Sequence, residues 1–121
     1  GSSVDAATMD QVRAVAEGKE TVLVILDSNH TYDHVMAELE LYAPLVTKGS
    51  YIVSTDGVMR DVADVPRAGE NWATDNPANA AEDFAAKHPD FVIEQPQWPF
   101  NESTLSRNVT HYPSAWLKRV R

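Results

Sequence analysis

The stretch that decides the fold is Val22-Leu23-Val24-Ile25-Leu26-Asp27. Its five consecutive apolar residues, three of them β-branched, predict a strand that is buried on both faces, as in a parallel sheet covered by helices. The strand stops abruptly at Asp27. Reactive groups in open α/β sheets lie just beyond the carboxyl ends of such strands, so Asp27 and His30 fall where chemistry is usually done.

Amphipathic helices are expected on either side of this strand. Apolar residues recur at helical spacing between residues 5 and 18, and again from 35 to 43. A second β-rich run, at 50–54, also breaks at an acidic residue, Asp56. Two successive units of strand, acidic loop and helix imply right-handed parallel crossovers in one sheet. The acidic residues that follow the two strands should therefore lie at the same edge.

The rest of the chain is expected to begin with a long loop and to end in antiparallel strands. Residues 59–76 have few periodic apolar positions, which is typical of a lid or a binding loop. The later elements are a helix from Pro77 to His88, a strand at 91–94, a turn region at 96–103 and a last strand around 105–112. Strands joined without a helix are expected to be antiparallel.

Composition favours one folded α/β domain over residues 1–121. The chain is 43% hydrophobic, and its formal charge of −8 repels a phosphate backbone while it attracts divalent cations. It contains no cysteine, which excludes disulfides and thiolate chemistry. No apolar run approaches the roughly 20 residues of a membrane span and no signal-peptide pattern is visible, so we expect a cytoplasmic protein that does not bind nucleic acid.

Asp27 and Asp56 form the strongest candidate site. Two carboxylates that lie close together repel each other unless a proton or a cation sits between them, and Mg²⁺ is the usual solution. The alternative is that each acid only caps the helix or turn that follows it.

Two histidines follow Asp27. His30, three residues on, is placed to take a proton from a metal-bound hydroxyl. His34 is expected to be a helix-start residue with a satisfied ring, although an Asp-x-x-His-x-x-x-His metal cluster is a further alternative. The tryptophans are expected to line a pocket or to anchor the core; they are Trp72, Trp98 and Trp116.

Some standard catalytic patterns are missing. No Gly-x-Gly-x-x-Gly motif follows a strand, so no standard cofactor cradle is visible. Neither Ser28 nor Ser54 lies in a nucleophile elbow, which argues against a serine hydrolase.

Several segments resemble the cephalosporin hydroxylase and rhamnosyl O-methyltransferase family. They are residues 1–13 and 22–26, the run Leu26-Asp27-Ser28-Asn29-His30-Thr31-Tyr32-Asp33-His34-Val35, residues 38–39 with 42–46, residues 49–53, and the closing residues 117–120. The similarity covers nearly all of the chain but only the C-terminal half of the family. It implies a three-layer Rossmann-like methyltransferase sheet, mostly parallel with an antiparallel C-terminal hairpin, that lacks the N-terminal half holding the cofactor.

The resemblance also implies roles for individual residues. Asp27 and Asp56 would be metal ligands with Thr55 completing the group, His30 would be the general base, and S-adenosylmethionine would be the methyl donor. Family members often carry an acid before the second aspartate, where this chain has the weaker ligand Thr55. In a half-sheet the strand at 22–26 is an exposed apolar edge, so we expect a homodimer or higher oligomer.

Two functions remain open at this stage. One is a metal-dependent O-methyltransferase that acts on a hydroxyl of a small molecule, sugar or lipid glycan, with this chain inactive on its own because transfer needs a positioned methyl donor. The other is a non-catalytic, oligomeric α/β protein descended from such an enzyme that binds a metal, a small ligand or a protein partner.

Overall fold

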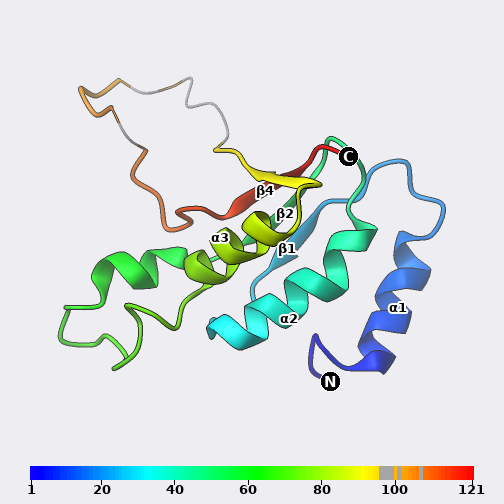
Figure 1. The fold of residues 1–121 in the computed structure, drawn as a ribbon, viewed down its shortest axis with the longest axis horizontal. Helices are drawn as coiled ribbons and strands as arrows, with labels where there is room; N and C mark the ends of the chain where they lie inside the picture. The colour runs from blue at the N-terminus through cyan, green and yellow to red at the C-terminus, as the bar shows by residue number, and fades with distance from the viewer. Residues whose placement is uncertain (96–99, 101, 107) are drawn as a thin grey trace.

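The computed structural model describes the chain except residues 96–99, 101 and 107 (Figure 1). The elements are, in chain order, α1 (Ala6–Ala16), β1 (Val24–Leu26), α2 (Tyr32–Tyr42), the 3₁₀ helix η1 (Ala43–Leu45), β2 (Tyr51–Ser54), the 3₁₀ helix η2 (Gly57–Val62), α3 (Pro77–Lys87), β3 (Phe91–Ile93) and β4 (Trp116–Arg119). The α-helices predicted near 5–18, 35–43 and 77–88 are confirmed, as are the strands at 50–54 and 91–94.

The strands form one mixed sheet in the order β1-β2-β4-β3. β1 and β2 are parallel, with Leu26 opposite Ser54, as the predicted crossover requires. β4 returns between β2 and β3 and is antiparallel to both. The α/β class and the antiparallel C-terminal pair are therefore confirmed, but the expectation of a mostly parallel sheet is wrong because β4 makes two of the three pairings.

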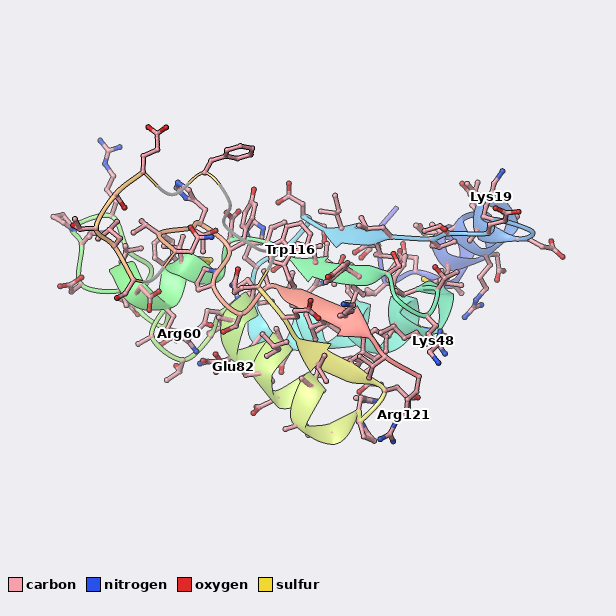
Figure 2. The ribbon with its side chains drawn as sticks, turned by 90° about the horizontal axis from the view of Figure 1, so that it is seen from above. Lys19, Lys48, Arg60, Glu82, Trp116 and Arg121 are labelled. Atoms are coloured by element: carbon pink, nitrogen blue, oxygen red, sulfur yellow. The ribbon has the colours of Figure 1, made fainter. Side chains whose placement is uncertain are left out.

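The α-helices α2 and α3 lie side by side on one face of the sheet (Figures 1 and 2). In the part of the chain that the structure describes, no α-helix covers the opposite face, so the expected third layer is absent there. Ile25, on that open face, is 62% exposed. The prediction that the strand at 22–26 is buried on both faces is therefore wrong. An apolar run shows that a strand can be buried, but it does not say how many layers cover it.

The core fills the space between the sheet and the two helices. Ile52 of β2 and Leu117 of β4 are paired residues of neighbouring strands. Both belong to one buried cluster with Leu39 of α2 and Phe84 of α3. Full burial of each such side chain stabilises the fold by about 1.5–3 kcal/mol. α1 adds the buried Met9 to this cluster. α2 and α3 thus pack against one face of the sheet and hold its strand ends in position.

Two further expectations concern the irregular segments. The loop predicted at 59–76 is irregular except where η2 enters it. The last strand predicted around 105–112 is wrong, because the described residues there form no strand and the chain enters the sheet only at Trp116. The turn predicted at 96–103 falls partly outside the described residues, as does Trp98. None of the described helices has the length and apolar character needed to cross a bilayer.

Candidate metal centre

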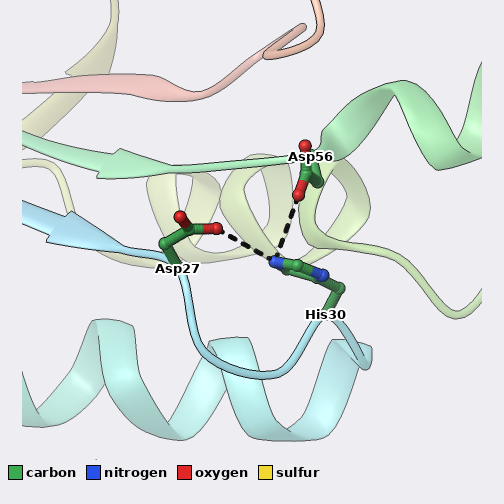
Figure 3. Close-up of side chains that lie close together, drawn as sticks. All are labelled: Asp27, His30 and Asp56. Atoms are coloured by element: carbon green, nitrogen blue, oxygen red, sulfur yellow. Dashed lines mark ion pairs between the residues drawn. The ribbon is translucent and has the colours of Figure 1, made fainter.

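The two acidic strand ends meet at one edge of the sheet, as the parallel crossover predicts. The Nε2 atom of His30 lies 3.4 Å from Asp27 Oδ1 and 3.4 Å from Asp56 Oδ2 (Figure 3). One potential ligand atom from each of these residues lies within 4.8 Å of the others. Ligand atoms on opposite sides of a bound Mg²⁺ are about 4.2 Å apart, so this spacing fits an ion after small side-chain movements.

The imidazole of His30 points into the gap between the two carboxylates (Figure 3). Its Nε2 atom is shielded from solvent and makes no well-aligned hydrogen bond to any group that the structure describes. A buried polar atom without a partner costs free energy, so Nε2 is available to a hydroxyl group of a bound molecule. The two facing carboxylates favour a cation between them. Carboxylate oxygens are hard ligands, so the two aspartates suit Mg²⁺ better than they suit a softer metal ion.

Asp56 is held in an unusual backbone conformation. Its φ of 57° and ψ of 22° lie in the left-handed region, which aspartate tolerates better than most residues. The next residue, Gly57, passes so close to the Pro113 carbonyl that an added Cβ would lie 2.8 Å from that oxygen. The Asp-Gly pair therefore turns the chain sharply at the end of β2 and aims the Asp56 carboxylate at His30.

Thr55 supports the site from the buried side. Its hydroxyl lies 2.8 Å from Asp27 Oδ1 and 3.0 Å from the Leu26 carbonyl oxygen, and it is the donor in both contacts. Its backbone N–H also donates to the Leu26 carbonyl oxygen. The resemblance implied that Thr55 is a metal ligand. In this geometry the Thr55 hydroxyl instead holds the Asp27 carboxylate in place.

His34 lies outside this cluster. Its Nε2 atom is 3.0 Å from Ser3 Oγ and 3.2 Å from Ser28 Oγ, and the Ser28 hydroxyl in turn donates to the buried Glu38. The expectation of a satisfied helix-start ring is confirmed. The alternative Asp-x-x-His-x-x-x-His metal cluster is not supported, because His34 faces the serines and Glu38. A serine-hydrolase triad is not formed either, since Ser28 and Glu38 both approach the same ring nitrogen.

η2, which follows Asp56, is tied to α3 by an ion pair. The Arg60 guanidinium donates to Glu82 (Figure 2) at 2.9 Å and to Asn79 at 3.0 Å. The hydrogen bond from Arg60 lowers the pKa of the Glu82 carboxyl below its usual value, and a second hydrogen bond from Ser114 acts in the same direction. These contacts fix the position of η2 beside the metal centre.

A pocket opens beside the centre and is lined by His30, Asp56 and the apolar side chains Val58, Met59, Val62 and Trp72. The expectation that a tryptophan lines a pocket is confirmed for Trp72. Val58, Met59 and Val62 were not singled out from the sequence; Met59 and Val62 lie in the segment 59–76 that was predicted to be a lid or binding loop, and Val58 directly precedes it. Trp116 instead packs edge-on against Tyr51 on the open face of the sheet.

These features define an α/β protein with a carboxylate and imidazole centre at the carboxyl ends of two parallel strands. A sequence model of the family described as rhamnosyl O-methyltransferase/CmcI matches residues 1–120, and the chain belongs to this family. This confirms the resemblance drawn from the sequence. No solved structure matches the chain.

Curated relatives with the printed name rhamnosyl O-methyltransferase match part of the chain. The proteins of Mycobacterium tuberculosis (strain ATCC 25618 / H37Rv) and Mycobacterium bovis (strain ATCC BAA-935 / AF2122/97) are each 39% identical over 56 residues, which is 46% of this chain and 23% of theirs. The Mycobacterium leprae (strain TN) protein is 36% identical over 64 residues, 52% of this chain and 28% of its own. The matched stretch thus spans about a quarter of the relatives' length.

Proposed function

We propose that this chain carries the metal-binding and proton-accepting part of an O-methyltransferase that uses S-adenosylmethionine and Mg²⁺. The observation that supports it most is the meeting of Asp27, His30 and Asp56 at the carboxyl ends of β1 and β2. Membership of the rhamnosyl O-methyltransferase/CmcI family supports the methyl-transfer chemistry.

Each residue has a distinct role in this proposal. Asp27 and Asp56 hold the ion, which when bound lowers the pKa of an acceptor hydroxyl. The neutral imidazole of His30 accepts the hydroxyl proton at Nε2, the nitrogen that faces both carboxylates. Thr55 keeps the Asp27 carboxylate in position through its hydroxyl. The acceptor is a small molecule, sugar or lipid glycan with a free hydroxyl, and a rhamnosyl group is the first one to test because the relatives' names contain it.

The methyl donor requires more than these residues. The sequence has no Gly-x-Gly-x-x-Gly pattern after a strand, so we propose that this chain alone does not hold the donor tightly and does not transfer a methyl group. Calorimetric titration with S-adenosylmethionine, with and without Mg²⁺, tests this. We expect no saturable heat up to millimolar donor, and tight binding would refute the proposal that this chain alone does not hold the donor.

We also propose that the chain associates with itself through β1. β1 is an edge strand that pairs only with β2 among the described residues, and its neighbour Leu23 and its own Ile25 are 48% and 62% exposed. An apolar edge with unpaired backbone groups is a template for a second strand. A second copy of the same edge would pair these groups and cover both side chains.

A further inference from the structure

The pocket beside the metal centre has the size of a site for one ring. Its volume is about 310 Å³, at the lower end of the roughly 300–1,000 Å³ of small-molecule sites. Two of the residues that line it, His30 and Asp56, belong to the proposed centre. A molecule bound in this pocket would therefore present its hydroxyl to the groups that hold the ion and accept the proton.

Trp72 is held in place at this pocket by the surrounding backbone. A Cβ added to Gly69 would lie 2.7 Å from the indole Nε1 atom, so only a glycine lets the indole lie this close to the chain. The Trp72 carbonyl accepts a hydrogen bond of 3.0 Å from the fully buried side chain of Asn76, which also caps α3. These contacts place the indole close to the backbone at Gly69 and tie the backbone of Trp72 to the start of α3.

The charges around the pocket disfavour an anionic acceptor. No lysine or arginine lines it among the described residues, and Asp56 contributes a carboxylate. Arg60, the basic residue of η2, directs its guanidinium to Glu82 of α3 (Figure 2) and to Asn79 of the same helix. Without the proposed ion, a phosphate or carboxylate in the pocket would meet the carboxylate of Asp56 and find no lysine or arginine partner among the described residues, which is costly in a partly desolvated site.

We infer, on the basis of the proposed methyl transfer, that this pocket is the acceptor subsite and that Trp72 is its platform. It takes an uncharged molecule whose reactive hydroxyl is on a ring with an apolar face. The ring lies on the indole of Trp72 against Val58, Met59 and Val62, and its hydroxyl faces His30. An uncharged sugar and an uncharged phenol share this chemistry, whereas a sugar phosphate does not.

Fluorine NMR of the chain labelled with fluorotryptophan tests this inference, with the Trp72 signal identified from Trp72→Phe. In the presence of Mg²⁺ we expect methyl rhamnoside or catechol to shift the Trp72 signal in a saturable way and to leave the Trp116 signal unchanged. Without Mg²⁺, where no ion can hold the phosphate, rhamnose 1-phosphate should produce no shift. The inference is overturned if neither uncharged ligand shifts the Trp72 signal, or if the phosphate shifts it equally in the absence of Mg²⁺.

Variants then assign the contact. Binding of the uncharged ligand, measured by saturation-transfer NMR, should weaken roughly fivefold in Trp72→Ala, as expected for the loss of one stacking partner. Trp72→Phe should restore most of it, and Trp116→Phe, the matched control, should have no effect. Equal affinity in the wild type and in both Trp72 variants would refute the role of the indole.

The metal proposal is tested separately by calorimetry of the same variants. Unchanged Mg²⁺ affinity in Trp72→Ala, together with weakened ring binding, supports a subsite distinct from the ion's ligands. A chain that binds the ring at Trp72 but binds no Mg²⁺ would overturn the proposed centre and leave the pocket standing.

Discussion

The Thr55 hydroxyl donates to Asp27 Oδ1 at 2.8 Å, so a side chain from the end of β2 fixes a carboxylate at the end of β1. Thr55 is buried, whereas Asp27 is largely exposed. Without this contact the Asp27 side chain would be free to turn toward solvent. The pair therefore couples the two strand ends that form the proposed metal centre.

Replacing this hydroxyl should weaken metal binding while the fold is kept. Thr55→Val preserves the shape of the side chain, and we expect Mg²⁺ affinity to fall by about tenfold, as is typical when the partner of a metal ligand is lost. Thr55→Ser keeps the hydroxyl and serves as the control, with affinity close to that of the wild type. Titration calorimetry measures both. An unchanged affinity in Thr55→Val would show that Asp27 does not depend on this hydrogen bond.

Asp56 should carry a backbone cost that glycine removes. Its left-handed conformation costs an L-residue roughly 1–2 kcal/mol, and less for aspartate. We expect Asp56→Gly to have a free energy of unfolding about 1 kcal/mol higher than Asp56→Ala, because both lose the carboxylate and only glycine tolerates the positive φ. Urea denaturation measures the difference, and equal stabilities would contradict the assigned conformation.

The Arg60–Glu82 pair predicts a pH-dependent contribution to stability. The pKa of the Glu82 carboxyl is lowered in the folded state, first by the hydrogen bond from Arg60. Such a group stabilises the fold above its unfolded-state pKa, and this stabilisation is lost as pH falls through the folded-state value. Because both side chains are partly exposed, the effect is expected to be below about 1 kcal/mol.

The variant Glu82→Gln measures this effect. We expect it to be less stable than the wild type at neutral pH, with the difference shrinking as the solution is acidified below the usual pKa of a glutamate. Glu70→Gln, at an exposed residue of the loop, is the matched control. A difference that stays constant across this pH range would argue against the ion pair.

The exposed edge of β1 predicts self-association. We expect the wild-type chain to sediment as a dimer or larger species and Ile25→Lys to sediment as a monomer, because a lysine at this 62% exposed position places charge at the shared edge. Val109→Lys, at a residue that is 80% exposed and belongs to no strand, should leave the mass unchanged. A monomeric wild type would contradict the proposed interface.

The sequence predicted the site better than it predicted the sheet. Asp27 and Asp56 were placed together because strand ends of a parallel crossover meet at one edge, a rule that depends on local pattern and handedness alone. The same pattern does not indicate whether helices cover the other face of the sheet, so the prediction that Ile25 is buried was wrong. β4 was missed because its pairing with β2 and β3 joins residues far apart in the chain, and the last strand was predicted at 105–112 instead.

Calorimetric titration of Mg²⁺ into the chain tests the central claim, the metal centre of Asp27 and Asp56, most directly. We predict one saturable site in the wild type, at least about tenfold weaker binding in Asp27→Asn and Asp56→Asn, since each removes a charged ligand, and nearly unchanged affinity in His30→Gln, since the proposed role of His30 is to accept a proton. The claim is contradicted if the wild type gives no saturable heat, or if it binds Mg²⁺ no more tightly than the two aspartate variants.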